Sequence, residues 1–163
     1  MKIRHLSADD NLHAVSRIYE ESWKCAYRDI LPAEYLKNIP AGHWVPYLKN
    51  AGRESLILTE DQQIIGTSSY SAARSMDLKN WGEIVSIYLL PEYTGKGYGQ
   101  SLLRATMDEL QHLGFHDIFL WVLEENHGAR QFYEKMGFQR SGRYLNDNIG
   151  GKALREIQYC YHI

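Results

Sequence analysis

The sequence predicts an α/β fold in which a mixed β-sheet of about seven strands is flanked by about four helices. Three observations predict it. Segments with alternating apolar residues interchange with segments whose apolar residues recur every three or four positions, in the order β-α-α-β-β-β-α-β-α-β-β. A strand, a helix and another strand follow one another between residues 82 and 123, which favours a parallel pair. The 163 residues, without repeat or linker, indicate a single domain over residues 1–163.

The N-terminal part is expected to hold a short strand over residues 2–7 and then an amphipathic helix. Ser7 and the two aspartates after it offer capping oxygens where this helix begins, and we expect it to end near Asp29. Between residues 31 and 53, prolines and glycines divide the chain into one or two short helices.

The rest of the chain alternates strands and helices. A hairpin is expected over residues 55–59 and 64–72, with a turn over 60–62. The elements expected after it are a strand over 82–90, a helix over 97–113, a strand over 116–123, a helix over 126–136, and strands over 138–145 and 154–161 joined by the loop NDNIGGK.

Charge and composition exclude several classes of protein. Eighteen Lys and Arg against 20 Asp and Glu give a net charge of −2, which argues against a protein that coats nucleic acid. Cys25 and Cys160 lie in no metal-ligand spacing, so we expect reduced thiols. The start has no apolar signal region and no stretch resembles a membrane span, so we expect a cytoplasmic protein without a membrane partner.

The most informative segment is a glycine turn within residues 87–103. Gly95, Gly97 and Gly99 alternate directly before a helix, where free backbone amides favour an anion. The spacing does not fit the dinucleotide fingerprint GxGxxG, because its third glycine position holds Gln100 or Leu102. It does not fit the nucleotide P-loop either, because Lys96 is followed by Gly97 and not by Ser or Thr. A turn without ligand is the alternative, but three glycines cost backbone entropy that a plain turn does not require. The turn therefore predicts a phosphate-bearing cofactor.

With these residues the sequence resembles the GNAT family of N-acetyltransferases, which transfer acetyl from acetyl-CoA to an amine. The run Thr94-Gly95-Lys96-Gly97-Tyr98-Gly99 is similar to the family's glycine signature. Further matches are Ile87-Tyr88-Leu89 before a proline, Asn126 at a helix start, and YEKMGF over residues 133–138. The resemblance covers residues 54–161 and extends to the first helix. It implies a GNAT-like sheet and acetyl-CoA as cosubstrate, with no metal.

The resemblance also implies which residues bind coenzyme A. The amides from Gly95 to Gln100 would hold the pyrophosphate, and the backbone of residues 87–89 would pair with the pantetheine arm like an added strand. Asn126 would contact this arm, cap the helix, or do both. Thr94 replaces the family's Gln or Arg, which predicts weakened binding, with Lys96 partly compensating. The implied cofactor-binding residues are Ile87, Tyr88, Leu89, Thr94, Gly95, Lys96, Gly97, Tyr98, Gly99, Gln100, Asn126 and Tyr133.

Three groups are candidates for the chemistry. Glu83, in the strand that leads to the glycine turn, is the candidate base for the amine proton; a strand-end carboxylate that meets water or pairs with a lysine, and a proton relay through water, are the alternatives. Tyr133 would protonate the CoA thiolate, or else is a core tyrosine. The N–H of Leu89 would stabilise the thioester oxyanion. His112 and His116 are separated by a helix-breaking glycine, so no metal site is expected.

Trp23 and Tyr27 belong to an aromatic segment that either packs the short helices or lines the acceptor pocket. We therefore predict an acetyl-CoA-dependent N-acetyltransferase that acetylates a primary amine of a small molecule or peptide directly, in a ternary complex. A non-catalytic acyl-CoA sensor is the alternative. The sequence does not name the acceptor, and a homodimer stays open.

Overall fold

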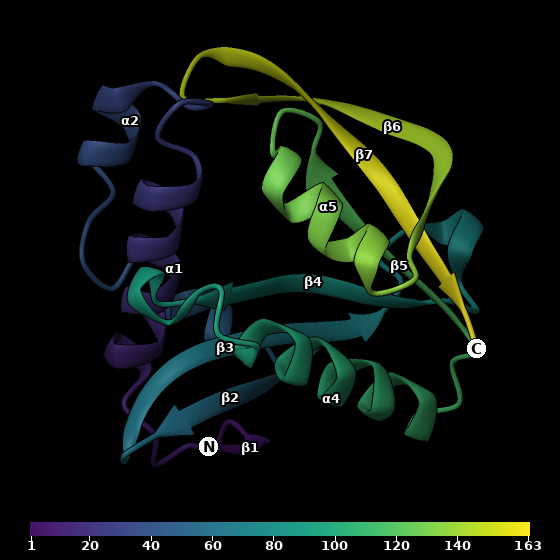
Figure 1. The fold of residues 1–163 in the computed structure, drawn as a ribbon, viewed down its shortest axis with the longest axis horizontal. Helices are drawn as coiled ribbons and strands as arrows, with labels where there is room; N and C mark the ends of the chain where they lie inside the picture. The colour runs from purple at the N-terminus through teal and green to yellow at the C-terminus, as the bar shows by residue number, and fades with distance from the viewer.

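The structure is a computed structural model that describes residues 1–163, and it contains one seven-stranded sheet in the order β1-β2-β3-β4-β5-β7-β6 (Figure 1). The strands are β1 (Lys2–His5), β2 (Glu54–Glu60), β3 (Gln63–Ala72), β4 (Gly82–Leu89), β5 (Asp117–Leu123), β6 (Gln139–Ile149) and β7 (Lys152–His162). The helices are α1 (Leu12–Ala26), α2 (Ala33–Lys37), α3 (Val45–Leu48), α4 (Tyr98–His112) and α5 (His127–Lys135). The predicted mixed α/β fold and element order are confirmed, with five helices because the segment over residues 31–53 forms two.

The sheet is antiparallel except between β4 and β5. This parallel pair was expected from the intervening helix, and it is short. Gly82 to Ile84 pair with Ile118 to Leu120, and no further residues of the two strands are paired. The second half of β4 therefore presents a free edge to the space between the strands.

Helices cover the two faces of the sheet. α4 and α5 pack on one face through Leu102, Leu103 and Tyr133, which belong to a core of 17 buried residues (Figure 1). The other face is covered by α1, whose Val15 packs with Ile57, and by α2, whose Leu36 packs with Leu123. The free edge of β4 is thus reached by side chains from both helical layers.

The predicted loop between the last two strands is wrong. Asn146, Asp147 and Asn148 lie in β6 and pair with β7, and only Gly150 and Gly151 form the turn, with φ of 61° and 86°. The polar run indicated a loop because it lacks apolar alternation, but this part of the hairpin is largely exposed and tolerates polar side chains. The longer hairpin carries further residues of β6 and β7 toward α2.

The start of the first helix also differs from the prediction. Asn11 caps α1 and accepts hydrogen bonds from the N–H groups of His13 and Ala14, at 3.1 and 3.2 Å. Asp10 instead accepts a hydrogen bond from Ser7 N–H at 2.8 Å and pairs with Arg4. The expected capping oxygens therefore close the preceding turn. No helix is both long and apolar enough to cross a membrane.

Candidate active site

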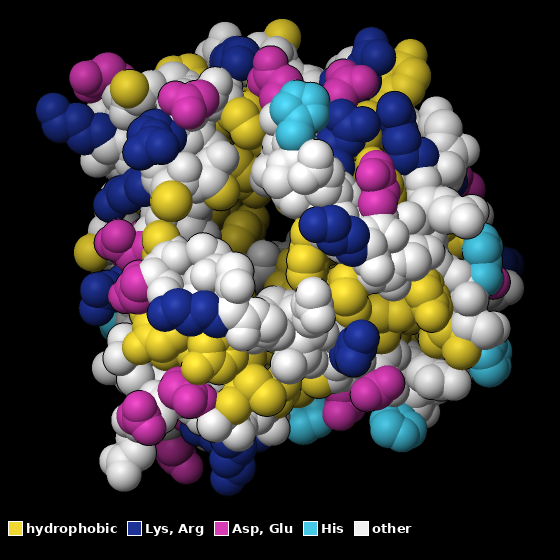
Figure 2. All heavy atoms as spheres, in the orientation of Figure 1, with side chains coloured by type: hydrophobic (Ala, Val, Ile, Leu, Met, Phe, Trp, Pro, Cys, Tyr) yellow, Lys and Arg dark blue, Asp and Glu magenta, His cyan; other side chains and the backbone are white.

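A cavity of about 980 Å³ opens where β4 and β5 separate, and its mouth appears in Figure 2 as a hollow with hydrophobic side chains around it. Its walls come from α1, the glycine turn, α5 and the hairpin of β6 and β7. The predicted site residues that line it are Trp23, Tyr27, Glu83, Ile87, Tyr88, Leu89, Thr94, Gly95, Gly97, Gly99, Gln100, Asn126 and Tyr133. Lys96 and Tyr98 do not line it.

The glycine turn has the backbone that an anion site needs. Gly95 and Gly97 have φ of 73° and 88°, which L-residues adopt only at a cost. Gly97 caps α4 without a side-chain hydrogen bond, and the first helical bond runs from Ser101 N–H to the Gly97 carbonyl. The amides between them have no helical partner. A Cβ on Gly95 or Gly97 would meet no atom within 4 Å, so the turn has open space beside these two residues.

Three side chains of the turn contact other parts of the chain. The hydroxyl of Thr94 donates to the Pro91 carbonyl at 2.7 Å, and the Lys96 ammonium lies 5.4 Å from the centre of the Tyr93 ring. Tyr98 stacks edge-on with the same ring. Lys96 and Tyr98 therefore contact Tyr93 and do not line the cavity, and compensation by Lys96 for the missing Gln or Arg stays a prediction.

The free edge of β4 carries the expected polar groups. Leu90 N–H donates to the Ile65 carbonyl at 2.8 Å, so the alternation of an antiparallel ladder turns the amides of Ile87 and Leu89 away from β3. They point to the side from which β5 has separated. The Leu89 carbonyl accepts a hydrogen bond from the hydroxyl of Ser22 at 2.6 Å. Sequence reasoning missed Ser22, which fixes α1 to this edge.

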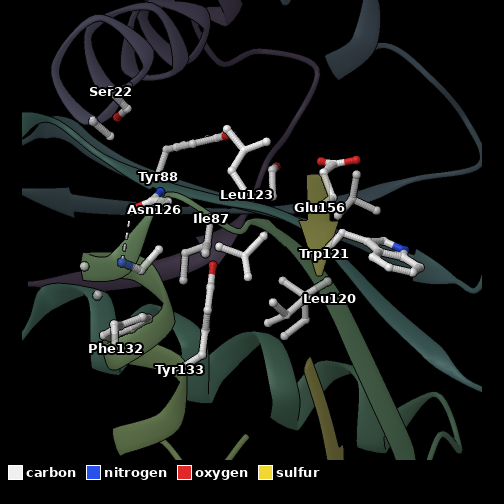
Figure 3. Close-up of a pocket in the computed structure, with 18 of the residues that line it drawn as sticks. Ser22, Ile87, Tyr88, Leu120, Trp121, Leu123, Asn126, Phe132, Tyr133 and Glu156 are labelled. Carbon is white, nitrogen blue, oxygen red and sulfur yellow. Dashed lines mark hydrogen bonds between the residues drawn. The ribbon is translucent and has the colours of Figure 1, made fainter. Parts of the chain in front are cut away.

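Tyr133 reaches the cavity from α5. Its side chain is 9% exposed, and no hydrogen-bond partner in the chain occupies the hydroxyl, which points into the cavity in Figure 3. Burial raises the pKa of Tyr133, so the phenol stays protonated at neutral pH. Nearby, Asn126 accepts a hydrogen bond from Ala129 N–H at 3.2 Å, which confirms its capping role (Figure 3). Its contact with a pantetheine arm stays a prediction.

Glu83 is 2% exposed and is held by Arg74. The guanidinium donates from Nη2 to one carboxylate oxygen at 2.6 Å, and from Nε to the other at 3.1 Å. The Arg74 backbone N–H adds a third hydrogen bond at 3.1 Å. The sequence left open that Glu83 pairs with a lysine, and in the structure its partner is an arginine instead. A proton that enters this carboxylate must displace part of that ion pair.

The aromatic wall on α1 combines both roles that the sequence left open. Trp23 Nε1 donates to the Tyr88 hydroxyl at 3.1 Å, and the hydroxyls of Tyr27 and Tyr88 lie 3.4 Å apart. Burial raises the pKa of Tyr27 to about 12, so it remains neutral. The rings pack α1 onto β4 and line the cavity at the same time.

Glu156 on β7 lines the same cavity and was missed by the sequence reasoning (Figure 3). Its carboxylate makes no hydrogen bond and no ion pair within the chain. Burial raises its pKa; Asp147 raises it further, while Arg74 lowers it. Strand alternation did not reveal it, because Ile157 and Tyr159 are the apolar positions and Glu156 and Gln158 resemble the solvent face of a strand. In the structure both faces of this part of β7 are covered, and Gln158, two positions from Glu156, is buried.

Comparisons with known proteins agree with this geometry. Residues 12–138 match the model of the acetyltransferase (GNAT) family. The spermidine N(1)-acetyltransferase of Thermoplasma acidophilum is 28% identical over 168 residues, covering 98% of each chain. The [ribosomal protein bS18]-alanine N-acetyltransferase of Haemophilus influenzae is 33% identical over 129 residues, covering 73% of this chain and 84% of the relative.

Solved structures show the same fold. The crystal structure of the PaiA N-acetyltransferase of Thermoplasma acidophilum in complex with coenzyme A superposes with a TM-score of 0.75 at 25% identity, and covers 98% of each chain. The seven-stranded sheet of the present protein, the match to the family model and the similar relatives all support the same family assignment. The chain belongs to the acetyltransferase (GNAT) family of N-acetyltransferases.

Proposed function

We propose that this protein transfers acetyl from acetyl-CoA directly to a primary amine while both reactants are bound in one ternary complex. The observation that supports this most is the single cavity joining the glycine turn, the free edge of β4 and the α1 wall. At one end of the cavity, the backbone amides of the glycine turn have no hydrogen-bond partner and can bind a pyrophosphate. In the middle, the unpaired backbone groups of β4 can hydrogen-bond to a pantetheine amide. The other end remains for the acceptor.

The residues present fit coenzyme A. The open space beside Gly95 and Gly97 leaves room for phosphate oxygens, whereas a Cβ added at Gly99 would lie 3.6 Å from the side chains of Leu89 and Phe132. The Leu89 N–H would then stabilise the oxyanion that forms when an amine attacks the thioester. Thr94 supplies no side-chain donor to the phosphates because its hydroxyl is bonded to Pro91.

The acceptor must lose a proton before it attacks. An alkylammonium with a pKa of about 10.4 is almost entirely charged at pH 7, so a group in the cavity has to accept that proton. Glu83 is the base predicted from the sequence, acting directly or through a water. Tyr133 protonates the CoA thiolate as the C–S bond breaks, since its hydroxyl is protonated and has no partner in the chain.

The acceptor belongs to the class of primary amines, in a small molecule or at a peptide terminus. The two relatives named above act on spermidine and on a ribosomal-protein alanine, so the family relationship leaves both kinds open. The sensor alternative is not favoured, because Tyr133 and two carboxylates line the same cavity as the CoA-binding elements.

A thiol-release assay tests this proposal. The protein is incubated with acetyl-CoA and a panel of polyamines, amino acids, aminoglycosides and peptides with free N-termini, and acetylated products are identified by mass spectrometry. We expect at least one amine to stimulate release of CoA thiol with matching acetylated product. Acetyl-CoA binding without stimulation by any amine would contradict the proposal and support the sensor.

A further inference from the structure

Two carboxylates line the cavity, and they differ in what holds them. Glu83 accepts three hydrogen bonds from Arg74, as described above. The carboxylate of Glu156 has no hydrogen bond or ion pair within the chain, although the residue is partly buried. A carboxylate taken partly out of water without a partner is the group that gains most from binding a cation or a proton. Glu156 is therefore the carboxylate of the site that has no partner within the chain.

Strand register places Glu156 on the acceptor side. It pairs with Leu123 of β5 and with Leu145 of β6, and cross-strand partners lie on the same face of a sheet. Leu123 packs in the cluster that includes Leu36 of α2. Glu156 therefore faces α1 and α2, whereas Tyr133 belongs to the core on the face covered by α4 and α5.

The space between β4 and β5 connects these two faces. A thioester held at the Leu89 amide would have the Tyr133 hydroxyl on one side and the acceptor, with Glu156, on the other. Acid and base are then separated by the reacting carbonyl, so neither neutralises the other. With Glu156 and Tyr133 on opposite sides of the thioester, the amine can enter from one face of the sheet while the thiolate leaves toward the other.

The surroundings of Glu156 suit an alkylamine. Trp121, Leu123 and Leu145 line the cavity beside it and provide apolar contact for a carbon chain. The charged and titratable groups that face it are Arg74 and Glu83 from the cavity wall, Asp147 and Arg143 from β6, and Tyr27 from α1. Arg143 is bound to Asp77, and Arg74 to Glu83, so both nearby guanidinium groups already have carboxylate partners.

We propose that Glu156 is a catalytic residue that binds the ammonium group of the acceptor and takes its proton. This inference rests on the proposed acetyl transfer. One N–H proton of the ammonium moves to a Glu156 oxygen, and the amine lone pair forms the C–N bond to the thioester carbon. The tetrahedral intermediate collapses, the C–S bond breaks, and the thiolate gains a proton from Tyr133. The second nitrogen proton is lost to water, Tyr133 regains a proton from water, and Glu156 releases its proton to water.

The test compares Glu156→Gln with Glu83→Gln, using the panel amine that gives the fastest thiol release. At pH 7 we expect Glu156→Gln to lower kcat/KM for that amine about 100-fold or more, the usual contribution of a positioned base. The dissociation constant for acetyl-CoA, measured by calorimetry, should not change. Glu109→Gln removes the same charge from α4, outside the cavity lining, and should leave both values unchanged.

The pH profile separates a base from a positioning residue. In the unmodified protein, kcat/KM should rise as the pH increases through the raised pKa of Glu156. It should then stay constant until the pH reaches the pKa of the amine. In Glu156→Gln, only the neutral amine reacts, so kcat/KM should rise tenfold per pH unit up to about pH 10. Glu156→Asp should regain part of the activity with the original profile.

Each outcome decides the proposal. A loss that is the same at every pH, or activity within twofold of the unmodified protein, would overturn it. If Glu83→Gln alone shows the steep pH dependence, the base is Glu83 and the inference is wrong. If the unmodified protein releases no thiol with any amine, the proposed function fails. Should Glu156→Gln not fold, by thermal denaturation and acetyl-CoA binding, then Glu156→Asp decides on the same profile.

Discussion

Replacing Gly97 with alanine tests whether the glycine turn exists for cofactor binding. Gly97 has φ of 88°, and an added Cβ would meet no atom within 4 Å. The methyl group therefore causes no clash in the free protein, and the only folding cost is the left-handed backbone, about 1–2 kcal/mol for an L-residue. That cost corresponds to a drop in melting temperature of about 2–8 °C for a chain of this length.

Binding should suffer beyond this loss of stability. The methyl group would project into the open space beside the glycine turn, where we expect the pyrophosphate to bind. Losing one charge-assisted hydrogen bond costs about 1.5–3 kcal/mol, which is about a 10- to 150-fold weaker affinity for acetyl-CoA. The measurements are a thermal melt and calorimetric titration with acetyl-CoA.

Gly114 supplies a matched control at the far end of the same helix. It has φ of 92° and equally open space around a Cβ, but it does not line the cavity. Gly114→Ala should lose similar stability and bind acetyl-CoA normally. Equal affinities in the two variants would refute the assignment of the glycine turn to the pyrophosphate.

Two further predictions concern single groups. Tyr133→Phe should lower kcat about 10- to 100-fold without abolishing turnover, because a thiolate with a pKa near 8.5 is a tolerable leaving group; unchanged kcat would remove Tyr133 from the mechanism. Arg4, hydrogen-bonded to Asp10 at 2.6 and 2.8 Å, holds the pKa of that carboxyl well below its usual range. The pair therefore stabilises the fold above the unfolded pKa of about 3.9, and this advantage fades as pH falls through the lower folded value. Urea denaturation of the unmodified protein and Asp10→Asn should show their stability difference shrinking below about pH 4, and a constant difference would contradict this linkage.

Helices and strands in which apolar residues repeat along a buried face were predictable from the sequence. The hydrophobic face of α4, its end at Gly114 and the parallel pairing of β4 with β5 all follow from local pattern and connection rules. The hairpin of β6 and β7 was drawn too short, because a polar, exposed ladder leaves no hydrophobic alternation to detect. Sequence pattern reports burial better than it reports backbone pairing.

The part of the candidate site that depends on local backbone conformation was predictable from the sequence. Contacts between side chains that are distant in the sequence were less predictable. The glycines at positions 95 and 97 indicated positive φ, which the structure shows. The ion pair of Glu83 with Arg74 depends on how the segment after β3 folds back onto β4, which spacing does not encode. Glu156 depends on register between β5 and β7, which only tertiary structure supplies.

The central claim, direct transfer within a ternary complex, is tested most directly by two-substrate kinetics. Initial rates of thiol release are measured over a grid of acetyl-CoA and acceptor amine concentrations. We predict double-reciprocal lines that intersect, because both reactants occupy one cavity before any bond changes. Parallel lines, together with an acetylated protein isolated when the amine is left out, would contradict direct transfer.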